Sequence, residues 1–133
     1  ALYLVDGSFI GGSLPWDADL IIARRYGERR FVRDNRSGII FSRINTGALE
    51  YAPAISSDER ELYFTRMSRL PFAQPSIWRA TRPDVRVQFN TPQRVPLDGF
   101  VEAPSLAPDG ALYFHRREEG HYRLYRLART SPP

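Results

Sequence analysis

Hydrophobic residues along this chain gather in short runs that are separated by turn-forming residues. Residues 61–66 and 111–116 are rich in Leu, Tyr and Phe, and turn sequences precede both runs: residues 58–60 read DER, and residues 108–110 read PDG. Runs of this kind are typical of β-strands. No segment repeats its hydrophobic residues with a helical period, and 11 Pro and 9 Gly interrupt the chain too often for long helices. The pattern therefore predicts an all-β fold.

Two segments of the chain resemble each other. Residues 50–64 read EYAPAISSDERELYF, and residues 101–114 read VEAPSLAPDGALYF. The Ala-Pro pairs align at an offset of 51 residues and, after a one-residue gap, the Leu-Tyr-Phe triplets align at an offset of 50. A weaker third copy opens the chain, where residues 1–4 resemble the Leu-Tyr-Phe strand and residues 19–24 resemble residues 76–81. Because internal repeats indicate a modular architecture, we expect similar β-units in series.

Each of the two clear units is expected to contain up to four short strands. The first strand of a unit begins at a proline, which suits the edge of a sheet because proline donates no ladder hydrogen bond. The expected strands are residues 53–56, 61–66, 76–80 and 85–89 in the first unit, residues 104–107, 111–116 and 121–128 in the second, and residues 31–33 in the weak copy.

Three residues of the predicted turns are expected to be structural. Asp58 and Asp109 should accept hydrogen bonds from nearby backbone N–H groups, and Gly110 should adopt a positive φ that other residues avoid. Pro108 presets the first dihedral angle of the second turn. These residues therefore shape the link between the first two strands of each unit.

The sequence around the second turn resembles a known family. Residues 102–114 (EAPSLAPDGALYF) and the LYRLART strand at 124–130 resemble the WD-like repeat of TolB-like β-propellers, whose pattern is Pro-x-x-Ser-Pro-Asp-Gly followed by an apolar strand. Residues 76–95 resemble the third and fourth strands of this repeat. The chain departs from the pattern twice, since Ala107 replaces the usual Ser and residues 57–59 lack both Pro and Gly. The resemblance implies β-propeller blades, two of them clear and one degenerate.

This resemblance implies one propeller-type domain in three parts. They are a degenerate blade portion at residues 1–48, a blade at 49–99 and a blade at 100–133. A blade takes roughly 40–45 residues and a ring usually contains about 4–8 blades, so the chain would form a partial ring. We expect either a piece of a longer propeller or copies that associate to complete a ring. The family resemblance also favours a periplasmic or secreted location.

The composition narrows the classes of function. With 42% hydrophobic and 26% charged residues, the chain is globular, and the absence of Cys excludes thiolate catalysis and Cys-ligated zinc. Its longest apolar run is too short to span a membrane, and no membrane partner is expected. The net charge of +4 rests on 19 Arg and no Lys, spread from Arg24 to Arg129. This spread is typical of a solvated surface encoded by a GC-rich genome, and no nucleic-acid partner is expected.

Motifs of enzymes and metal sites are missing from the sequence. The two histidines, His115 and His121, flank one predicted hairpin tip with Glu118 and Glu119 between them, which is typical of an ordinary polar tip. The chain contains no HExxH, DxDxDG or GxSxG motif. TolB-like propellers also occur in serine oligopeptidases as a non-catalytic domain beside a hydrolase domain, and we expect no hydrolase domain within these 133 residues. We therefore predict no catalytic residue, no metal and no cofactor.

Residues just before the two inner prolines are candidates for ligand binding. Glu50, Tyr51 and Glu102 lead into the innermost strands and should lie near one mouth of a central channel, with His115 close by. Propellers bind ligands at this place, which is an analogy of fold alone. The predicted function is a non-catalytic binding or scaffolding module with a protein partner. The alternative is recognition or hydrolysis of a carbohydrate or peptide ligand at Tyr51, Glu102 and His115.

The aromatic-rich strands also predict self-association. Residues 62–65 and 112–115 are apolar on both alternating faces, so each needs a neighbouring sheet on either side. The last unit of a partial array has no following unit, and its outer face should expose large side chains. We therefore expect the chain alone to self-associate through its terminal units, unless residues 1–48 cover that face.

Overall fold

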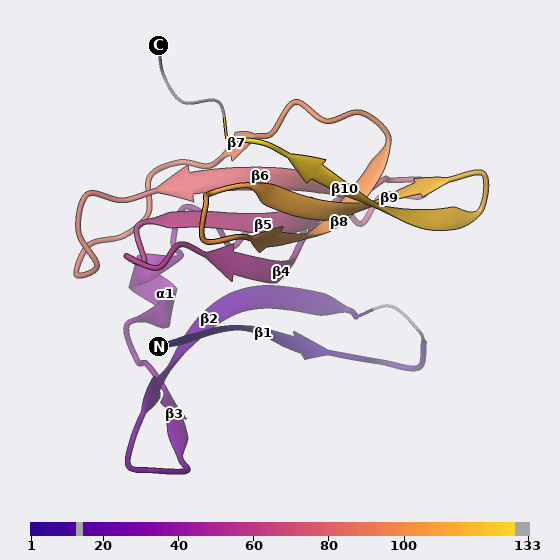
Figure 1. Cartoon of the computed structure of the whole chain (residues 1–133). Helices are drawn as coiled ribbons and strands as arrows, with labels where there is room; N and C mark the ends of the chain where they lie inside the picture. Colours follow the sequence, from indigo (N-terminus) through magenta and orange to yellow (C-terminus); the bar gives the residue numbers. More distant parts are fainter. Residues whose placement is uncertain (13–14, 130–133) are drawn as a thin grey trace.

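The computed structural model describes residues 1–12 and 15–129, which form three antiparallel β-sheets in series (Figure 1). Sheet 1 contains β1 (Leu2–Ser8), β2 (Asp17–Arg25) and β3 (Phe31–Arg33). Sheet 2 contains β4 (Leu49–Ile55), β5 (Glu61–Met67), β6 (Ser76–Thr81) and β7 (Gln93–Arg94). Sheet 3 contains β8 (Phe100–Leu106), β9 (Leu112–Glu118) and β10 (His121–Leu127). Between sheets 1 and 2 lies α1 (Ser37–Ile40), the one helix among these described residues. The all-β prediction is confirmed.

The inner strands differ from their prediction, because they begin before the prolines. Pro53 lies inside β4 and Pro104 lies inside β8, each directly after a residue with a positive φ: 51° at Ala52 and 55° at Ala103. At both places the register with the next strand shifts, as it does at a β-bulge. A bulge removes residues from the hydrogen-bonded ladder. The prolines are therefore accommodated inside a strand rather than at its start.

The prediction of a strand at residues 85–89 is wrong, because this segment forms a turn instead. The Asp84 carboxylate accepts a hydrogen bond from the backbone N–H of Arg86 at 2.8 Å, and the Val87 N–H bonds back to the Asp84 carbonyl. This local turn competes with an extended conformation. Phe89 leaves the turn and enters the core, and the outer strand of sheet 2 forms further along, as β7.

The core consists of two layers, one on each face of sheet 2. Sheets 1 and 2 enclose Leu20, Ile22, Ile40, Phe41, Ile44, Leu62, Phe64, Ala80 and Phe89. Sheets 2 and 3 enclose a smaller cluster of Ile77, Val101, Leu112 and Phe114. Sheet 2 is thus covered on both faces. Sheets 1 and 3 each bury one face and expose large side chains on the other, among them Leu2, Leu4, Tyr122 and Leu124.

The segment around α1 closes the first core layer. Its side chains bind the backbone of β2: the Ile22 N–H donates to Ser37 Oγ at 3.0 Å, and the Asn45 side chain bonds both the N–H and the carbonyl of Leu20. These contacts hold Phe41 in place, where its ring stacks on that of Phe89 at a centroid distance of 5.8 Å. This short segment therefore supplies much of the packing between sheets 1 and 2.

The turn at Gly110 makes a first testable prediction. Gly110 has φ of 81°, and a Cβ built on it would lie 2.8 Å from Arg129 Cδ. We expect Gly110→Ala to lower the free energy of unfolding by more than the about 1–2 kcal/mol that a left-handed conformation costs an L-residue, because the new methyl group would also displace Arg129. Urea denaturation measures the loss. Gly120→Ala is the control, because Gly120 has φ of 80° and open space around it; an equal loss in both variants would mean that the Arg129 contact adds nothing.

Candidate functional site

The candidate residue Tyr51 lies against the next sheet. Its hydroxyl donates a hydrogen bond to Glu102 Oε2 at 2.8 Å, which joins β4 to β8. Burial and the neighbouring Glu102 carboxylate both raise the pKa of the Tyr51 hydroxyl. The hydroxyl therefore remains a protonated donor at neutral pH, and the pair acts as a link between two sheets.

Glu50 is fully buried, on the opposite side of β4. Its carboxylate accepts hydrogen bonds from the backbone N–H and the hydroxyl of Thr46 and from Arg66 Nε at 2.7 Å. Arg66 also donates to the Ile44 carbonyl and lies over the Trp78 ring, 4.5 Å from its centroid. Because no part of Glu50 reaches solvent, it holds structure together and cannot contact a ligand.

His115 is exposed on β9, directly opposite Glu102 in the register of β8 and β9. Its ring lies 6.4 Å from that of Tyr122. The structure thus brings Tyr51, Glu102 and His115 into one neighbourhood and separates Glu50 from them. Three of the four candidate ligand-binding residues therefore share one surface.

This surface continues over the exposed side of sheet 3. We call it the sheet-3 outer face; it consists of Phe100, Glu102, Tyr113, His115, Arg117, Tyr122, Leu124 and Arg126. Tyr122 is 55% and Leu124 is 67% exposed. The Arg117 guanidinium lies 5.7 Å from the centroid of the Phe100 ring, and the Phe100 and Tyr122 rings meet edge to face at 6.1 Å. Aromatic, Leu and Arg side chains therefore form a continuous outward surface.

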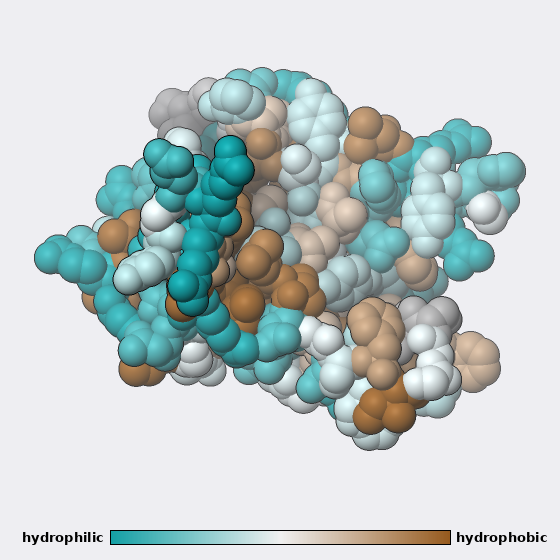
Figure 2. Space-filling view, turned by 90° about the horizontal axis from the view of Figure 1, so that it is seen from below, coloured by the Kyte–Doolittle hydropathy of each residue, from teal (hydrophilic) through white to brown (hydrophobic). Residues whose placement is uncertain are grey.

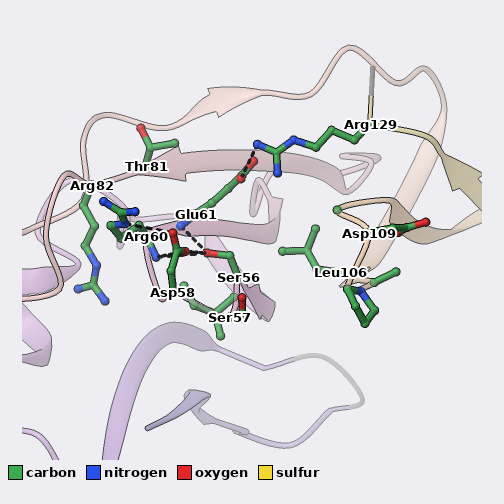
Figure 3. Close-up of a pocket in the computed structure, with 14 residues that line it drawn as sticks. Ser56, Ser57, Asp58, Arg60, Glu61, Thr81, Arg82, Leu106, Asp109 and Arg129 are labelled. Atoms are coloured by element: carbon green, nitrogen blue, oxygen red, sulfur yellow. Dashed lines mark hydrogen bonds and ion pairs between the residues drawn. The ribbon is translucent and has the colours of Figure 1, made fainter. Parts of the chain in front are cut away.

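A cavity of about 690 Å³ lies at the other end of the strands, between the β4–β5 turn and the β8–β9 turn (Figure 3). Its walls include both turn aspartates, Asp58 and Asp109, together with Gly110, Glu61 and Arg129. Asp58 receives hydrogen bonds from the Ser56 hydroxyl and the Arg60 N–H, and Asp109 receives one from the Ala111 N–H at 3.0 Å. The predicted structural turn residues thus line this cavity.

Each of these three carboxylates is held in its ionised form. Hydrogen bonds from Ser56 and Arg60 lower the pKa of Asp58 to about 2. The Ala111 N–H and Arg126 lower the pKa of Asp109. Burial would raise the pKa of Glu61, but hydrogen bonds from Arg79 and Tyr63 outweigh it and lower the pKa. A general acid needs a carboxyl group that keeps its proton near neutral pH, so these groups are poorly suited to act as general acids.

Arg82 also borders this cavity, but it binds sheet 1. Its Nε donates to the Glu59 carbonyl at 2.8 Å, its Nη2 donates to the Tyr3 hydroxyl at 2.6 Å, and its guanidinium lies 4.3 Å from the Phe89 ring centroid. In Figure 3 the side chain points away from Asp109. Burial raises the pKa of Tyr3 to about 12, so the Tyr3 hydroxyl stays neutral beside Arg82. Arg82 therefore fastens sheets 1 and 2 together.

A second cavity, of about 550 Å³, lies between the β1–β2 hairpin and the β5–β6 loop. Trp16, Leu70 and Phe72 line it and are at least 64% exposed. No sequence pattern pointed to this cavity, because its two walls are loops that are distant in sequence.

Within residues 1–12 and 15–129, no group of His, Asp or Glu side chains converges as a metal site would require. No helix in that part of the chain is long and apolar enough to cross a membrane. Comparison with protein-family models, with characterised proteins and with solved structures yields no significant match to this chain.

Proposed function

We propose that this chain is a partial TolB-like β-propeller that works as a non-catalytic binding module and recognises a protein partner through the sheet-3 outer face. The proposal has two parts, the architecture and the binding surface. Different observations support each of them.

The propeller architecture is supported by features that recur in sheets 2 and 3. Both inner strands contain a bulge at an Ala with a positive φ. In sheet 2 the Arg66 guanidinium lies over the Phe64 and Trp78 rings, and in sheet 3 Arg116 lies over Phe114 and Tyr125 in the same way. Repeated local geometry of this kind is what successive blades would share.

The binding surface is supported by one observation above all, the exposure of Leu124 among aromatic and Arg side chains. Leu124 pairs with His115 in the sheet as Ile77 pairs with Thr65, yet Ile77 is fully buried and Leu124 is 67% exposed. Tyr and Arg are enriched among the residues that contribute most to binding at protein interfaces, and exposed contiguous apolar patches mark such sites. The sheet-3 outer face therefore has the chemistry of a protein-binding surface.

The test is affinity capture with Leu124→Asp. We expect a protein that is retained by the unmodified chain to be lost with Leu124→Asp, because the interface would have to bury a charge. Ile39→Asp is the matched control, since Ile39 is 64% exposed on α1, away from sheet 3, and should retain the protein. Quantitative mass spectrometry of captured proteins gives the readout, with melting temperatures to verify folding. Equal retention by both variants would contradict the proposal.

A further inference from the structure

The two end sheets of this chain expose faces that are complementary to each other. On sheet 1 we call the exposed side of β1 and β2 the sheet-1 outer face; it consists of Leu2, Leu4, Asp6, Ser8, Asp17, Asp19 and Ile21. Leu2 and Leu4 are each 40% exposed. Figure 2 views the chain from below, on the side of sheet 1, and shows brown hydrophobic residues exposed among teal hydrophilic ones.

The sequence alignment relates these faces to buried ones. Leu2 and Leu4 align with Leu62 and Phe64 of sheet 2, which pack against sheet 1 in the first core layer. In the same way, the position of Leu124 in sheet 3 corresponds to that of Ile77 in sheet 2, which packs against sheet 3. The exposed face of sheet 1 therefore corresponds to the face of sheet 2 that packs against the sheet before it in sequence. The exposed face of sheet 3 corresponds to the face of sheet 2 that packs against the sheet after it.

The charges of the two faces are also complementary. Asp6 and Asp19 lie directly opposite each other in the register of β1 and β2, an arrangement of like charges that is unfavourable within a sheet. Arg33 of β3 forms an ion pair with Asp6, whereas Asp19 forms no ion pair within the described residues. Burial and the nearby carboxylates of Glu50, Asp17 and Asp6 raise the pKa of Asp19. Basic side chains brought near Asp19 would relieve this repulsion.

The matching basic groups lie on sheet 3. The part of the sheet-3 outer face that β9 and β10 contribute contains Arg117 and Arg126 and no carboxylate. Arg126 donates a hydrogen bond to Asp109 at 2.8 Å, so Arg117 is the basic group that we expect to face the partner. The Leu-Tyr strand at Leu2 aligns with that at Leu62 at an offset of 60 residues, and the latter aligns with that at Leu112 at an offset of 50. Asp6 therefore aligns with Arg116, the residue before Arg117. Arg117 and Asp6 thus lie at corresponding ends of their strands, as a contact between the two faces requires.

We propose that the partner of this face is a second copy of the chain, and that two copies close head to tail into a ring of six sheets. This rests on the proposed propeller architecture. The number of sheets selects the dimer: each chain supplies three sheets, and rings contain about 4–8 blades. One copy falls below this range and three copies exceed it. In the dimer, the sheet-3 outer face of each copy covers the sheet-1 outer face of the other.

Size-exclusion chromatography with light scattering tests the proposal on the full chain. We expect a mass of twice 15.3 kDa at micromolar concentration. Arg117→Asp places an acidic group on each end face, and Asp6→Arg/Asp19→Arg places basic groups on each, while the latter variant also loses the Asp6–Arg33 ion pair. Since like charges facing each other cost several powers of ten in affinity, either variant alone should weaken the dimer by more than about a hundredfold. Asp19→Arg alone, which removes the repulsion without disturbing other pairs, provides a milder second variant.

The mixture of the two reversed variants is the decisive measurement. In a mixed dimer, each acidic face meets a basic one, so equal amounts should restore the dimer that neither variant forms. Arg29→Asp, in the β2–β3 hairpin outside both faces, should leave the dimer intact. A monomeric unmodified chain, or a mixture that stays monomeric, overturns the proposal. If such a monomer still captures another protein in a Leu124-dependent way, only this inference fails and the proposed function stands.

Discussion

Replacing Glu50 by alanine is expected to lower the free energy of unfolding by about 3–5 kcal/mol, because it breaks a buried ion pair from one side only. The Arg66 side chain is only 16% exposed and would lose its carboxylate, and the Thr46 N–H would lose its acceptor. Guanidinium or urea denaturation, followed by circular dichroism, measures the loss.

Two further variants separate charge from shape. Glu50→Gln keeps the shape but cannot neutralise Arg66, so it should recover only part of the loss. Glu28→Ala removes an exposed carboxylate and should change stability by less than about 0.5 kcal/mol. A Glu50→Ala variant as stable as Glu28→Ala would show that the Glu50–Arg66 pair does not stabilise the fold.

The corresponding positions of sheet 3 show why the Glu50–Arg66 pair should matter for stability more than an exposed pair would. Val101 aligns with Glu50, and Arg116 aligns with Arg66, so the second unit has kept the arginine without its carboxylate. Arg116 Nε has no hydrogen-bond partner within the described residues, its Nη1 lies 3.9 Å from Glu118 Oε1, and its side chain is 26% exposed. An arginine nearer to solvent can hydrate the rest of its guanidinium. The more deeply buried Arg66 therefore relies more on the Glu50 carboxylate to balance its charge than Arg116 relies on any one partner.

Phe41→Ala should cost about 3–5 kcal/mol, the usual loss for a large aromatic side chain removed from a core. Phe41 is fully buried, stacks on Phe89 and meets the Tyr3 ring edge to face. Its removal would leave a cavity between sheets 1 and 2, where α1 offers little freedom to collapse. Thermal and chemical denaturation both report the change.

The neighbouring Ile39 provides a matched control on the same helix. It is 64% exposed, so Ile39→Ala should be nearly neutral, which separates burial from any effect on α1 itself. If both variants lost similar stability, the helix rather than the aromatic packing would be responsible. An unchanged Phe41→Ala would contradict the assignment of Phe41 to the core.

Most strands could be predicted from the sequence because their signals are local. The Leu-Tyr-Phe runs became β5 and β9, and the turns before them formed around Asp58 and Asp109. The prediction of a strand at residues 85–89 was wrong for an equally local reason. The Asp84 side chain accepts a hydrogen bond from the Arg86 N–H and stabilises a turn in place of the extended strand. The starts of β4 and β8 were displaced by bulges, whose register shift depends on the partner strand.

The candidate site was predictable only in part. Tyr51, Glu102 and His115 were singled out by their place before the inner strands, and they do lie together. Glu50 occupies the adjacent position, but it turns to the other side of β4 and is enclosed there. The sequence could not tell a buried structural residue from an exposed ligand-binding residue at these two positions. The Glu50 carboxylate is buried against Thr46 and Arg66, and no sequence pattern around Glu50 predicts these contacts.

The sequence by itself determined the all-β class and the turn residues of this protein, because alternation, Pro, Asp and Gly act on the backbone within a few positions. Only the tertiary structure decided which surfaces are covered. Phe41 lies in a stretch without a repeat pattern and became central because β2 and Phe89 surround it. Leu124 resembles a core residue in sequence and is exposed, because burial depends on the sheets that pack against a strand from elsewhere in the fold.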